Sequence, residues 1–122
     1  MDTTITTTDR LSDALLSLAV SGWRFSRAHV ALVQSLALAD QPRHMASVRF
    51  YQRHLEDTLR GLGYEVVDLT GHGIDPGLPV VVLNLGDFTA RDLLVVDQVI
   101  EPVIMCDGSV VKTGTVVARK IG

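Results

Sequence analysis

The periodicity of apolar residues changes abruptly at Leu62-Gly63-Tyr64, and this change divides the chain into two parts. Before it, apolar residues recur every three or four positions, a spacing that is typical of amphipathic helices. After it, short runs of β-branched residues alternate with turn residues, a pattern that is typical of short strands. Gly63 is well placed to end a helix. The sequence therefore predicts an α+β chain, with an N-terminal helical hairpin followed by a small all-β domain.

The boundaries of these parts follow from the same pattern. Residues 1–8 are mostly threonine without apolar periodicity, and we expect them to form a disordered tail. Residues 9–62 form the predicted helical region. Asp40-Gln41-Pro42 interrupts its periodicity, because proline disfavours a helical conformation at the preceding residue and suits the first turn of a new helix. A short connection between two helices implies antiparallel neighbours. Residues 63–122 form the predicted β domain.

The first helix carries a heptad-like seam. Eight positions follow one another at alternating spacings of four and three residues, and Gly22 and His29 occupy two of them. The six apolar members are Leu11, Leu15, Leu18, Phe25, Leu32 and Leu36. A seam of this kind is typical of a helix that packs against another helix. A second apolar stripe lies beside it, so we expect the helix to pack on the next helix, on a second copy of the chain, or on both. The seam predicts a homodimer.

Two signals are prominent in the β part. Asp107-Gly108 lies between two β-branched runs, and both residues tolerate a positive φ, so the pair predicts a tight hairpin. Pro102 interrupts the second of two strands predicted at residues 93–96 and 99–105, which indicates a strand edge or a bulge there.

Charge restricts the kind of partner. The net charge of the 122-residue chain is −3, which argues against nucleic acid as a ligand. The charge is uneven, because residues 63–122 contain eight acidic residues against four basic ones. The β part would therefore suit a partner with basic patches.

Features of compartment and chemistry are few. The single cysteine, Cys106, cannot form an internal disulfide, and it fits a reducing compartment. No signal-peptide pattern and no apolar run of membrane-spanning length is present, so we expect a cytoplasmic protein without membrane attachment. The four histidines, at positions 29, 44, 54 and 72, lack metal-ligand spacing. Asp107 beside Cys106 disfavours a reactive thiolate. We therefore expect no enzyme activity, metal or cofactor. A small enzyme that uses Cys106 or a histidine is kept as an alternative hypothesis.

Several motifs occur together in one order. They are Leu15-Leu16-Ser17-Leu18-Ala19, Leu62-Gly63-Tyr64-Glu65, Ile74-Asp75-Pro76-Gly77-Leu78, and the final strands from Ser109 to Ala118. In this order and at these spacings the chain resembles the GrpE family, the nucleotide exchange factors of DnaK-type seventy-kilodalton chaperones. The likeness covers about residues 10–120. Lys112 stands where the family has an arginine.

The resemblance implies a fold, a partner and a site. Members of the family dimerise through their helices, and the β domain docks on the nucleotide-binding domain of the chaperone and promotes ADP release. Carried over by motif, the partner-binding residues are Asp75, Pro76, Gly77, Leu78, Lys112, Thr113 and Val116. The family's His-x-Ala pattern is replaced by Pro79-Val80-Val81. This replacement motivates an alternative, a dimeric adaptor of the same fold that binds a chaperone-like ATPase without exchange activity.

Overall fold

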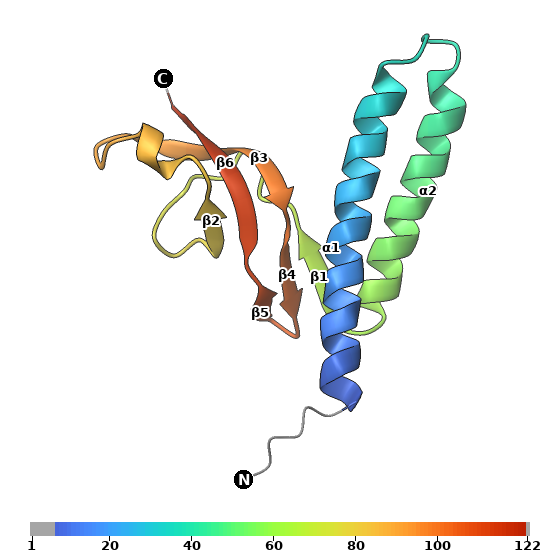
Figure 1. Ribbon diagram of the computed structural model, residues 1–122, viewed down its shortest axis with the longest axis horizontal. Helices are drawn as coiled ribbons and strands as arrows, with labels where there is room; N and C mark the ends of the chain where they lie inside the picture. The colour runs from blue at the N-terminus through green and yellow to red at the C-terminus, as the bar shows by residue number, and fades with distance from the viewer. Residues whose placement is uncertain (1–6, 122) are drawn as a thin grey trace. The chain divides into compact units, whose positions relative to one another are not determined.

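The computed structural model describes residues 7–121, and the chain divides into two compact units, Met1–Leu55 and Glu56–Gly122. A pair of helices precedes a set of short strands (Figure 1). The elements are α1 (Thr7–Gln34), α2 (Gln41–Arg60), β1 (Tyr64–Val67), β2 (Val80–Val82), the 3-10 helix η1 (Leu85–Asp87), β3 (Leu94–Glu101), β4 (Val103–Cys106), β5 (Ser109–Lys112) and β6 (Gly114–Lys120). The predicted α+β class, with two helices ahead of a small β region, is confirmed.

The start of α1 lies earlier than the apolar pattern predicts. Thr7 and Thr8, which we expected in the tail, are helical, and residues 1–6 of that tail lie outside the described residues. Asp9 falls in the first turn, where a carboxylate interacts favourably with the unpaired N–H groups and the helix dipole. This favours a helix that begins before the first leucine.

The end of α1 is capped by Gln41, the first residue of α2. Its side-chain amide donates to the carbonyl oxygens of Gln34 (3.3 Å) and Leu36 (2.9 Å). The bond to Gln34 satisfies a carbonyl group that the helix end leaves without a helical partner, and Leu36 belongs to the segment that follows the helix. The connection therefore occupies residues 35–40, and Leu36, which we predicted as the last position of the seam, lies beyond the helix.

The two antiparallel helices lie side by side (Figure 1). They approach each other closely at Gly22. A Cβ atom at this position would lie 2.5 Å from the Tyr51 hydroxyl oxygen and 3.6 Å from Leu55 Cδ2. One turn further along, the buried Ser26 hydroxyl accepts a hydrogen bond from Nε2 of Gln52 (3.4 Å). Gly22 therefore provides the space for the α2 side chains, and Ser26 is satisfied within the same interface.

The second unit contains two three-stranded sheets. Their strand orders are β1-β4-β5, which is antiparallel throughout, and β2-β6-β3, in which β2 is parallel and β3 antiparallel to the central β6. Val116 and Ala118 of β6 are buried, as are Val99 and Val96, which lie opposite them on β3. One face of the second sheet therefore belongs to the core.

Pro102 marks the point where the chain passes from one sheet to the other. The strands that we predicted at residues 93–96 and 99–105 are divided differently, because β3 runs unbroken from Leu94 to Glu101 and β4 begins at Val103. Proline has no N–H to donate to a ladder, so the pairing ends there. Pro102 itself is buried.

Two turns have the backbone conformation that their sequence predicts. Gly63 has φ +86° in the turn that follows α2, where glycine adopts the left-handed conformation without steric cost; the helix itself ends at Arg60, two residues before the predicted boundary. Asp107 (φ 49°) and Gly108 (φ 85°) join β4 to β5 in the predicted two-residue hairpin. The N–H of Asp107 also donates to the carbonyl of Gly63 (3.2 Å), which fixes the hairpin beside the start of β1.

Candidate functional site

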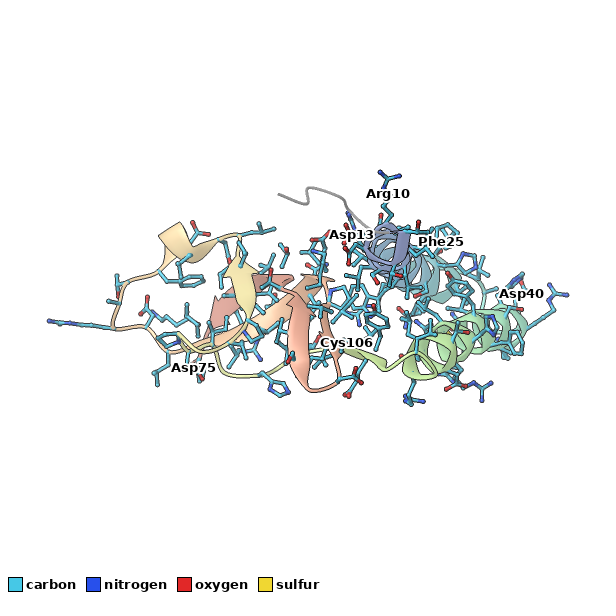
Figure 2. The ribbon with its side chains drawn as sticks, turned by 90° about the horizontal axis from the view of Figure 1, so that it is seen from below. Arg10, Asp13, Phe25, Asp40, Asp75 and Cys106 are labelled. Carbon is cyan, nitrogen blue, oxygen red and sulfur yellow. The ribbon has the colours of Figure 1, made fainter. Side chains whose placement is uncertain are left out.

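The turn at residues 75–78 is held by its own hydrogen bonds. Asp75 Oδ1 accepts from the N–H of Gly77 (2.7 Å), and the N–H of Leu78 donates to the Asp75 carbonyl (3.1 Å). Pro76 restricts φ at the second position. The first three residues are exposed and Leu78 is half-buried. The segment that precedes β2, on which Asp75 is marked (Figure 2), is thus a fixed turn that displays a carboxylate.

The structure brings this turn next to the second predicted docking segment. The N–H of Gly114 donates to the carbonyl of Pro79 (2.9 Å), and Val80 then pairs with Gly114 in the parallel β2–β6 ladder. Leu78 directly precedes Pro79, and Thr113 directly precedes Gly114, so this hydrogen bond brings Leu78 and Thr113 close together. Two segments that are distant in the sequence form a single edge of the β unit.

Lys112 belongs to the same edge, and its ammonium group forms an ion pair with Glu101. Its Nζ lies 3.6 Å from Oε1 of Glu101, and the Thr115 hydroxyl donates to the same carboxylate oxygen (3.2 Å). The side chains of Lys112 and Glu101 are both partly buried, so this ion pair orients the ammonium group more than an exposed pair would.

Val116 does not belong to this surface. Its side chain is 1% exposed in the central strand of its sheet, so it cannot contact a docked partner directly. Alternation along a strand explains the difference: Thr115 and Val117 point to the opposite face from Val116. The role that the resemblance implies for Val116 is therefore corrected to core packing.

The seam on α1 separates into an exposed row and a half-buried row. Leu11, Leu18, Phe25 and Leu32 recur every seven residues and are 62–69% exposed. We call these four residues the α1 stripe. Leu15 is half-buried, and Leu36 lies beyond the helix at 38% exposure. Four large apolar side chains at one heptad position, exposed along most of a helix, indicate a surface for a partner.

An apolar groove of about 180 Å³ runs beside the middle of the stripe. Its lining is Phe25, Ser26 and His29 from α1 together with Ser47, Val48 and Tyr51 from α2. Phe25 is labelled on α1 in Figure 2, and the His29 ring stacks on it with 6.0 Å between ring centroids. The groove extends the apolar surface from α1 onto α2.

Sequence reasoning missed the exposed aromatic residues of α2. Phe50 is 69% exposed and stacks on His54, one turn away, and Tyr51 is 42% exposed. The available signal was the repeated Phe-x-x-x-His spacing on both helices, at 25/29 and 50/54. Such i, i+4 pairs share a helix face.

The surroundings of Cys106, one of the residues considered for catalysis, disfavour a thiolate. Burial and the neighbouring Asp107 carboxylate, 3.7 Å from the sulfur, raise the pKa of the Cys106 thiol. A raised pKa lowers the thiolate fraction, which a nucleophile needs. The pKa of the Asp92 carboxyl group is shifted in the opposite direction. It is lowered mainly by the hydrogen bond from the Thr89 backbone N–H (2.8 Å) and further by the positive charge of Lys120. This carboxylate closes a loop.

Within residues 7–121, no three His, Cys, Asp or Glu side chains gather so that they could hold a metal ion. Neither helix of the described chain combines the length and apolar character needed to cross a lipid bilayer. Comparison with protein-family models, curated proteins and solved structures finds no match. The candidate site is therefore defined by two features of this chain, the edge at residues 75–79 and 112–114 and the α1 stripe.

Proposed function

We propose that this protein is a homodimeric nucleotide exchange factor that binds the nucleotide-binding domain of a DnaK-type chaperone ATPase and promotes ADP release. The observation that carries the proposal is the hydrogen bond between Gly114 and Pro79, because it unites the turn at residues 75–78 with Lys112-Thr113. The resemblance assigns both segments to docking. Their convergence on one edge is what a single binding surface requires.

The proposed mechanism needs no bond to be made or broken by this chain. The β unit binds the open conformation of the ATPase more tightly than the closed one, and so it shifts the population toward the form that releases ADP. A preorganised turn suits this task, because little conformational entropy is lost when it docks. Asp75 and Lys112 would contribute charge-assisted contacts. The setting that we propose is the cytoplasm, where the free Cys106 remains reduced.

The α1 stripe supports the dimeric part of the proposal. At 1.5 Å per residue, the distance from Leu11 to Leu32 is about 30 Å, so the stripe would contribute one side of a long helix–helix contact. The neighbouring groove between α1 and α2 would receive side chains from the second copy. Two hairpins that met in this way would form a four-helix bundle.

The alternative function is a dimeric adaptor that binds a chaperone-like ATPase without accelerating exchange. It is favoured by the segment Pro79-Val80-Val81, which replaces the family's His-x-Ala pattern. Here Val80 and Val81 are the first two residues of β2, and their main chain pairs with β6. A strand in this place can support binding while lacking the side chains that the family presents.

The test is stopped-flow release of a fluorescent ADP analogue from the DnaK-type ATPase of the same organism, with and without this protein. The informative variant is Asp75→Asn combined with Lys112→Met. Asparagine retains the side-chain oxygen that accepts from Gly77, and methionine retains most of the lysine stem, so the charges are removed with the fold preserved. Glu65→Gln, at an exposed position on β1, is the matched control.

We expect the wild type to accelerate release, the double variant to lose most of this acceleration, and Glu65→Gln to behave as wild type. Binding without acceleration would favour the adaptor. A wild-type protein that neither binds the ATPase nor changes the release rate would overturn both proposals.

A further inference from the structure

The outer face of the β2-β6-β3 sheet carries apolar residues that the core does not use. The register places Val81 beside Thr115, and the N–H of Leu83 donates to the Val116 carbonyl (2.9 Å), so the parallel ladder continues beyond β2. Because side chains alternate, Val81, Leu83 and Val117 point away from the buried Val116. We call these three residues the outer patch.

Two of the three residues of the outer patch are exposed, and Val117 is half-buried. Val81 is 56% exposed and Leu83 is 60% exposed, although each belongs to or directly follows a paired strand. Leu93, just before β3, and Ile121, just after β6, are also exposed, and the Ile121 N–H donates to the Leu93 carbonyl (2.9 Å). Apolar side chains grouped on one face in this way mark a surface that binds another protein.

The charges around the patch indicate the chemistry of that protein. Asp75 precedes β2 and Asp87 ends η1, so exposed carboxylates flank the patch on both sides along the chain. Arg119, the basic residue that follows Val117 on this face, is paired with Asp97 at 3.3 Å. Residues 63–122 contain eight acidic residues against four basic ones. A complementary partner therefore presents apolar side chains surrounded by lysine or arginine.

A second copy of the chain fits the outer patch less well than a partner with basic side chains. In a symmetric pair the same patch lies on both sides, so acidic residues would approach their own equivalents. The patch is also continuous with the proposed docking edge, because Val81 lies only two residues beyond Pro79, whose carbonyl accepts from Gly114. An ATPase that docks on the turn at residues 75–78 would thus reach the outer patch.

We propose that the outer patch is the apolar centre of the ATPase-docking surface, with the turn at residues 75–78 at its rim, and that it binds an apolar site of the ATPase bordered by basic side chains. This inference rests on the proposed function. It adds the residues that supply most of the binding, since desolvated apolar contacts at the centre of an interface outweigh charged contacts at its rim.

The test compares two matched double variants. Val81→Thr with Leu83→Thr makes the patch polar and places threonine, a β-branched residue that favours a strand, at both positions. Val110→Thr with Val111→Thr makes the same kind of change on β5, where both valines are exposed. Circular dichroism and the urea midpoint establish that both variants are folded. Binding to the isolated nucleotide-binding domain is measured by calorimetry, and self-association by sedimentation velocity.

We expect the patch variant to bind the nucleotide-binding domain about tenfold more weakly than the wild type, and to accelerate ADP release correspondingly less. The β5 variant should match the wild type in both measurements. If the wild type binds and accelerates release but the patch variant does so equally well, the inference is wrong and the exchange function stands. If the wild type does not bind at all, both are wrong. Loss of self-association without loss of ATPase binding would assign the patch to a second copy and overturn the inference.

Discussion

The side-chain amide of Asn84 forms two hydrogen bonds with the main chain of Ala118, as a neighbouring strand would. Its Nδ2 donates to the Ala118 carbonyl, and its Oδ1 accepts from the Ala118 N–H, both at 2.9 Å. Asn84 lies just beyond β2, where the parallel ladder with β6 ends. One carboxamide thus satisfies two main-chain groups of the central strand in a half-buried position, and it holds the end of β2 in place.

Replacing Asn84 by alanine should therefore destabilise the β unit. Both Ala118 groups would lose their partners, and we expect the free energy of unfolding to fall by about 2 kcal/mol. Asn84→Asp should also destabilise, because a carboxylate oxygen would replace the donor that faces the Ala118 carbonyl. Urea unfolding followed by circular dichroism measures the effect, with the exposed Gln98→Ala as the control. An Asn84→Ala midpoint equal to the wild type would show that solvent replaces both bonds.

The contact between Asn84 and Ala118 is also an example of a feature that the sequence alone could not predict. Features set by one residue and its neighbours were predictable: the hairpin at Asp107-Gly108 and the left-handed turn at Gly63 after α2 follow from backbone preferences. The parallel pairing of β2 with β6, and the bonds between Asn84 and Ala118, join residues that no local pattern relates. The same holds for the candidate site, because the turn at residues 75–78 was recognisable whereas its position beside Thr113 depends on the sheet.

Gly114 is expected to tolerate no side chain. A Cβ atom there would lie 3.0 Å from Val103 Cγ2 and 3.1 Å from the Glu101 carbonyl oxygen, in a buried position. Because main-chain atoms are among the neighbours, Gly114→Ala should lower the free energy of unfolding by about 1–3 kcal/mol and loosen the edge formed with Pro79. Gly86→Ala is the control, since nothing lies within 4 Å of its added Cβ. Equal urea midpoints for the two variants would contradict this prediction.

Self-association should depend on the α1 stripe. Leu18→Ser with Phe25→Ser removes two apolar side chains that are 68% and 69% exposed, so the fold of the single chain should remain. We expect the proposed dimer of the 13.2 kDa chain to dissociate into monomers at micromolar concentration, as measured by sedimentation velocity. Leu38→Ser is the matched control, because this exposed leucine lies in the connection between the helices. A wild-type protein that is already monomeric would refute the role of the stripe.

The thiol of Cys106 should react slowly, for a reason that one substitution can isolate. Burial and the Asp107 carboxylate raise its pKa, so at pH 8 less thiolate is present than for an ordinary cysteine, and alkylation by iodoacetamide should be slower than that of glutathione. The rate should continue to rise with pH beyond the range in which a free thiol levels off. Asp107→Asn removes the negative charge while asparagine tolerates the positive φ of 49°, so the midpoint of the pH–rate profile should move to lower pH. If this variant changes only the maximal rate and leaves the midpoint in place, restricted access explains the slow reaction and the carboxylate does not.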